Sequence, residues 1–147
     1  MIESIANALK SEIDATSLFD SAATVAYVPK VSQEELDAGI NVTIVPKSVA
    51  EERASRYTWD SEWQVDVAIQ RAVTSDTTTV NSELVGELLG KGKLMRNALK
   101  KCANRFAGAV LTKIGTPALW IPDHLKRGVF TSVVTVTFEA EDDFTDD

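Results

Sequence analysis

Few residues in this sequence have the type and spacing that catalysis or metal binding requires. The 147 residues include one histidine, His124, and one cysteine, Cys102. A single imidazole leaves no partner for a two-histidine zinc site. Cys102 follows Leu99 at helical spacing, which predicts a buried structural thiol. Paired acids such as Glu51 and Glu52 are adjacent in the chain, so their side chains point apart.

Sequence motifs for nucleotide binding or nucleophilic catalysis are also missing. The chain contains no G-x-S-x-G, no Walker A and no G-x-G-x-x-G. Gly90 to Lys93 (GKGK) follows a predicted helix and not a strand, which makes it a poor phosphate cradle. We therefore expect no enzyme activity, no cofactor and no bound metal. A small enzyme or ligand-binding domain remains an alternative, although the sequence offers no convergent polar site for it.

Charge is distributed in blocks along the chain. The net charge is −7, with −9 in residues 1–90, +8 in residues 91–127 and −6 in residues 128–147. Such asymmetry is typical of a nucleic-acid face or of surfaces that pair between copies, while any single charge can simply be solvated. The basic candidates lie on the outer face of a predicted helix: Lys93, Arg96, Lys100, Lys101 and Arg105.

A second group of candidate interface residues lies in Lys47–Ser61, the least periodic stretch of the first half. It contains Arg53, Arg56, Tyr57 and Trp59. Aromatic residues mixed with arginine are typical of protein interfaces. We interpret the stretch as a mobile or partner-facing loop. The alternative is that the two aromatic residues only cover a sheet edge.

Strands must position these candidates. Val129–Glu139 is rich in β-branched residues and predicts an interior strand with one apolar and one threonine-rich face. Glu62–Val73 alternates apolar and polar residues, as in an antiparallel sheet with one solvated face. Ala22–Val28 and Ile40–Val45 predict two further strands, paired antiparallel, the second ending at Pro46. Residues 109–122 suggest an edge strand.

Helices are predicted at the N-terminus and in the middle of the chain. An apolar stripe over Ile2–Ile13 predicts an amphipathic helix. A second helical region begins near Asn81. Glycine disfavours helix interiors, so we expect a break near Gly90 and a separate helix from Lys93 to Phe106.

Together these elements predict one α+β domain over residues 1–140. Its antiparallel or mixed sheet has about four to five strands and packs against the N-terminal helix and the central helical region. Residues 141–147 predict a flexible acidic tail. We expect no secretory signal and no membrane span, because no basic and apolar leader and no run of about 18 apolar residues occurs.

The order of these elements resembles small neck proteins of tailed bacteriophages, most closely the tail terminator group, also called tail completion or minor tail proteins. The resemblance covers about a third of the chain in three segments. These are Val42–Ser48 (VTIVPKS), Ser55–Val73 (SRYTWDSEWQVDVAIQRAV) and His124–Glu139 (HLKRGVFTSVVTVTFE). The predicted break near Gly90 and the acidic tail depart from the family pattern.

The resemblance implies a virion protein assembled in the host bacterial cytoplasm. It implies a homo-oligomeric ring, commonly six-fold, between the tail tube protein and the head-side connector, which stops tube growth and passes DNA through its bore without specific binding. A head-to-tail ring would let the +8 block of one copy meet an acidic surface of the next. The alternatives are a head-completion adaptor of the connector and a nucleic-acid-binding module that uses the basic helix 93–105.

Overall fold

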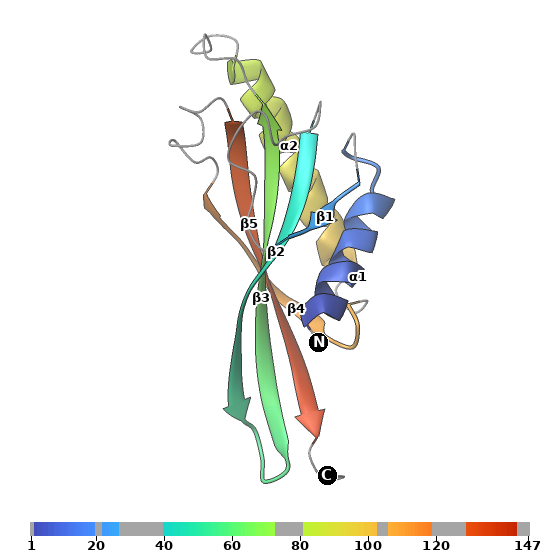
Figure 1. The fold of residues 1–147 in the computed structure, drawn as a ribbon, viewed down its shortest axis with the longest axis vertical. Coiled ribbons are helices and arrows are strands. Elements are labelled where there is room, and N and C mark those ends of the chain that lie inside the picture. The colour runs from blue at the N-terminus through green and yellow to red at the C-terminus, as the bar shows by residue number, and fades with distance from the viewer. Residues whose placement is uncertain are drawn as a thin grey trace.

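The chain folds into a five-stranded mixed sheet with two helices on one face (Figure 1). The computed structural model describes residues 2–19, 22–26, 40–72, 81–102, 106–118 and 129–143. The strands follow the order β1-β2-β3-β5-β4, and every pair is antiparallel except β1 with β2. The predicted α+β class is therefore confirmed. The elements are α1 (Ile2–Ala15), β1 (Thr24–Val25), β2 (Ile40–Arg53), β3 (Thr58–Ala72), α2 (Asn81–Lys101), β4 (Val110–Ala118) and β5 (Val129–Asp143).

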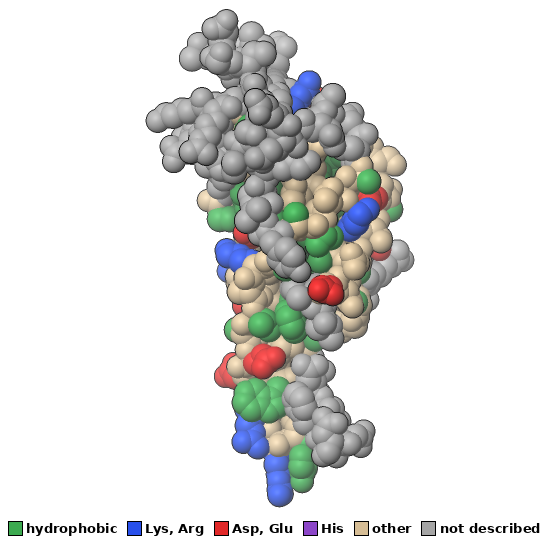
Figure 2. Space-filling view, in the orientation of Figure 1, with side chains coloured by type: hydrophobic (Ala, Val, Ile, Leu, Met, Phe, Trp, Pro, Cys, Tyr) green, Lys and Arg blue, Asp and Glu red, His purple; other side chains and the backbone are tan. Residues whose placement is uncertain are grey.

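The three longest strands extend well past the helices. β3 and β5 each have 15 residues and β2 has 14, so each runs about 45–50 Å at ~3.3 Å per residue. α1, with 14 residues, is only about 21 Å long. The far ends of β2, β3 and β5 therefore project beyond the helices as a three-stranded arm (Figure 1, Figure 2). We define the arm as residues 49–62 together with 139–143.

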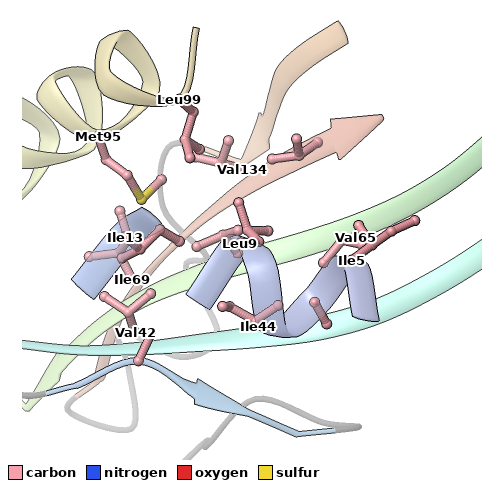
Figure 3. Packing of buried hydrophobic residues seen from close by; sticks show 14 of the residues in the cluster. Ile5, Leu9, Ile13, Val42, Ile44, Val65, Ile69, Met95, Leu99 and Val134 are labelled. Atoms are coloured by element: carbon pink, nitrogen blue, oxygen red, sulfur yellow. The ribbon is translucent and has the colours of Figure 1, made fainter. Parts of the chain in front are cut away.

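The core lies between the helices and the near half of the sheet. α1 buries Ile5, Leu9 and Ile13, and the strands bury alternate side chains toward them, including Val67 on β3 and Val134 on β5. Figure 3 shows Met95 of α2 above Ile13 of α1, and Leu99 of α2 beside Val134 of β5. Burial on this scale removes apolar surface from water and is the main source of stability.

The apolar face predicted for β3 and β5 is confirmed, but the solvated face predicted for β3 is wrong in its inner half, where Ala68 and Gln70 are buried. Phe130, Val134, Val136 and Phe138 all face the helices and are buried. β5 lies between β3 and β4, as an interior strand should. Its threonine-rich face lies on the opposite side of the sheet, which we call the open face. The outer half of this face lines a shallow groove that includes Thr135 and Thr137.

The predicted break near Gly90 is wrong. α2 is one helix of 21 residues that includes Gly90 and Gly92, and it ends at Lys101. A Cβ on Gly92 would lie 3.6 Å from Ile69 Cδ1, so the helix packs close to the sheet at this point. Tertiary packing overrides the intrinsic helix propensity of glycine here. The predicted second helix does not reach Phe106, which instead forms an isolated bridge with Ala109.

The predicted end of β2 at Pro46 is also wrong. β2 continues to Arg53, and the register with β3 shifts between Pro46 and Ser48. Such an irregularity tolerates the missing proline N–H that would interrupt a regular ladder. Residues 47–53 and 58–61 are therefore paired strands, and only residues 54–57 form the connection.

The first strand differs from its prediction in length and direction. Thr24 and Val25 alone are assigned to β1, and they pair parallel to Thr43 and Ile44 of β2. The connection of about a dozen residues is long enough for the crossover that a parallel pair needs. The carboxylate of Asp14 anchors the entrance to β1, because its Oδ1 accepts a hydrogen bond of 2.8 Å from the backbone N–H of Ala23.

Part of the predicted acidic tail belongs to the sheet. β5 runs to Asp143, and the backbone of residues 141–143 pairs with residues 58–60 of β3. The boundary predicted after residue 140 therefore falls inside a strand. On the other side of β5, Val110–Ala118 forms the edge strand β4, which confirms part of the strand suggested for residues 109–122. Residues 119–122 lie outside the described ranges.

Candidate functional site

The tip of the arm brings four predicted interface residues together: Arg53, Arg56, Tyr57 and Trp59. Arg53 ends β2 and holds the turn, since its Nε and Nη2 atoms donate to the backbone oxygens of Ser55 (3.1 Å) and Arg56 (3.0 Å). The Arg56 guanidinium lies 5.2 Å from the centre of the Tyr57 ring. This cation–π distance favours a fixed arrangement of the two side chains.

The aromatic side chains at the tip remain accessible. Tyr57 is 50% exposed and Trp59 is 38% exposed. Val49, further back on β2, is 46% exposed and lies directly opposite Trp63 in the register. The helix-side face of the arm therefore presents apolar groups that no described residue covers, and Figure 2 shows hydrophobic side chains along the arm with basic ones at its end.

The open face of the arm is acidic. Five carboxylate residues line a groove on this part of the sheet together with Ala50 and Ser61. They are Glu52, Asp60, Glu62 and Glu139, which the strand register places on the open face, and Glu51, which lies opposite Ser61 and belongs to the helix-side face. All five are exposed, and none forms an ion pair with a described residue. Closer to the core, by contrast, Asp66 accepts a hydrogen bond from Thr135 Oγ1 (2.7 Å) and lies 3.9 Å from Lys47 Nζ.

The basic candidates on α2 form a separate surface. Lys93, Lys100 and Lys101 are exposed, and Arg96 is half-buried beside Gly92. Leu94, on the same outward side, is 55% exposed. Arg105 lies outside the described residues. The structure thus separates the two predicted groups: one is at the arm tip, the other on the outer side of α2 (Figure 1).

The acidic groove was not predicted from the sequence. The sequence does contain a pattern that indicates this groove. The alternation of Glu62–Val73 extends backward to Asp60, and a β2 that continued past Pro46 would place Glu52 opposite Asp60. Reading Pro46 as the end of the strand concealed this pairing. Cys102, by contrast, packs half-buried against the core, in partial agreement with the predicted buried thiol.

No group of three or more His, Cys, Asp or Glu side chains in the described part of the chain is arranged to hold a metal ion. No helix among the described residues is long and apolar enough to cross a membrane. Comparison with protein-family models and with curated proteins found no match for the chain. The functional argument therefore depends on the surfaces described above.

Proposed function

We propose that this chain is a structural protein of a tailed-phage virion, a tail terminator that forms a ring between the tail tube and the head-side connector. In this role it caps the growing tube and lets DNA pass through the bore. The ring is a homo-oligomer, with six subunits expected from the resemblance to the tail terminator group. We expect no catalytic activity and no cofactor.

The place of the resembling segments in the fold supports this proposal. Val42–Ser48 lies in β2, Ser55–Val73 includes all of β3, and the last part of His124–Glu139 lies in β5. These strands are separated in sequence but adjacent in the sheet. The resemblance therefore concerns one continuous structural unit, the centre of the sheet from which the arm projects.

The arm is the observation that carries the proposal. A three-stranded extension adds little apolar burial to its own subunit, and this one exposes Val49, Tyr57 and Trp59. Exposed aromatic and arginine residues at a preformed tip are typical of side chains that become buried in a subunit interface. An extended element of this kind suits a head-to-tail contact, in which the arm of each subunit reaches the next and the ring closes.

The proposal is tested by native mass spectrometry and negative-stain microscopy of the purified protein, alone and with purified tail tubes. We expect closed rings with a central hole, and rings bound at the tube ends. Tubes polymerised with the protein should be shorter than tubes polymerised without it. A chain that stays monomeric in both conditions and leaves tube length unchanged would refute the proposal.

The basic outer side of α2 favours a second candidate, a nucleic-acid-binding module. Lys93, Lys100 and Lys101 are exposed on one helix and form no ion pair with a described residue. Such a module predicts DNA binding that weakens steeply with salt. The net charge of −7 disfavours it. Tight, salt-sensitive DNA binding by a monomer would select this function over the ring.

A further inference from the structure

The acidic groove on the arm contains like charges placed directly opposite one another. In the strand register Glu52 pairs with Asp60, and Glu62 pairs with Glu139. Side chains directly opposite across an antiparallel pair lie close together, and like charges there are destabilising. The strands of an isolated subunit therefore gain no stability from these four residues, and a cation placed over the groove would relieve the repulsion.

Apolar residues border the groove on both sides. Across the sheet, Ala50, Glu62, Glu139 and Val110 occupy one row of the register, so the two carboxylates lie between two apolar side chains. Val110 is 46% exposed at the outer edge. Lys47 and Lys113 line the adjoining groove with Glu62 and Glu139, but neither forms an ion pair with them, and Lys47 lies 3.9 Å from Asp66. This face therefore fits a partner that combines positive charge with some apolar surface.

The outer side of α2 has this composition. Leu94 is its exposed apolar residue, and Lys101 lies on the same side of the helix two turns later. Lys93 and Lys100 lie about 100° around the helix from these two and are also exposed. A subunit cannot place its own α2 on its own arm, because α2 is packed on the helix-side face of the sheet and the groove is on the open face. The complementary surface must come from another copy.

We propose that the acidic groove on the arm of one subunit binds the outer side of α2 of a second copy, with Lys100 and Lys101 opposite Glu62 and Glu139. The proposal rests on the proposed ring and specifies its subunit contact. Charge complementarity sets the register of this contact, and its strength falls as salt screens the charges.

Two charge-reversal variants test the contact. The two variants are E62K/E139K and K100E/K101E. In a ring built only from copies of one variant, every proposed contact joins like charges. We expect the subunit dissociation constant of each to rise by about tenfold or more, which corresponds to a loss of one close charge pair. The control is E3K/E12K on α1, which changes net charge as E62K/E139K does and leaves the contact intact.

Mixing the two variants gives the decisive result. In a ring in which they alternate, every contact again joins opposite charges, so an equimolar mixture should form rings at a concentration at which neither variant does alone. Rescue by mixing also shows that both chains are folded. If the wild-type chain forms rings and the variants assemble equally well, or if mixing restores nothing, the proposed contact is wrong and the ring stands. A wild-type chain that never forms rings, with or without tubes, would overturn both proposals.

Discussion

Replacing Gly90 with alanine should stabilise the protein. Gly90 lies within α2, is exposed, and a Cβ added there meets no atom within 4 Å. Alanine is favoured over glycine in a helix interior by about 1 kcal/mol, because the unfolded glycine chain has more conformational freedom to lose. For a domain of this size that gain raises the melting temperature by about 4 °C.

The assay is urea unfolding followed by far-UV circular dichroism, at one fixed protein concentration because ring formation would itself stabilise the fold. With an m-value of about 2 kcal/mol/M, the midpoint should rise by about 0.5 M at unchanged slope. The matched control is Gly108→Ala. Gly108 also has open space around it, but its φ is +83°, a conformation that alanine adopts only with strain.

The two substitutions should therefore shift the midpoint in opposite directions. A G90A variant with an unchanged or lower midpoint would refute the argument, since it would mean that α2 is not helical through this position in solution. Equal shifts of the same sign in both variants would show that backbone conformation does not decide the effect of either glycine.

Three further predictions concern the core, the arm and pH. Phe138→Ala should lower the free energy of unfolding by about 3–5 kcal/mol, because Phe138 is fully buried and its ring centre lies 5.0 Å from that of Phe106. A loss below about 1 kcal/mol in urea unfolding would contradict this packing. Trp59→Ser should change the free energy of unfolding by no more than ~0.5 kcal/mol, because the side chain is exposed at the arm tip. The same variant should weaken ring assembly, measured by native mass spectrometry. A strongly destabilised variant would mean that Trp59 stabilises the subunit itself and not the interface. Burial alone would raise the pKa of Asp14, but hydrogen bonds from Lys10 and from the Ala23 N–H outweigh burial and hold the pKa below its ordinary value of 3.8. The stability that the Asp14 carboxylate contributes is therefore complete above pH 3.8 and is lost as the pH falls through the lowered pKa. Asp14→Asn should accordingly flatten the acid limb of stability against pH, and a limb identical to wild type would reject this role.

The sequence predicted the parts of the fold that burial determines. In β3 and β5 one face is covered by helices, so residues at every second position had to be apolar, and the pattern is legible without a structure. α1 shows the same logic at helical period. These predictions depend only on which side of an element meets the core.

The sequence predicted less of the structure in regions that the helices do not cover. The arm has no helix over it, so residues 47–61 lost the apolar alternation and resembled a loop although they are mostly paired. The parallel direction of β1 depends on the path of its connection, which local pattern does not encode. The tip residues could be named as interface candidates because aromatic and arginine side chains are typical of interfaces whatever their position in the fold. The acidic groove was missed because it exists only once three distant segments are placed side by side.

The outer edge of β2 bears on how the chain avoids aggregation. Beyond Ile44 this strand pairs only with β3 among the described residues, so its other side offers unpaired backbone groups over several residues. Long open edges of this kind template fibrils and amorphous aggregates. Here the edge includes Lys47, Glu51, Glu52 and Arg53, which are exposed. Charges at these positions disfavour edge-to-edge pairing, so we expect them to protect the chain against aggregation through this edge.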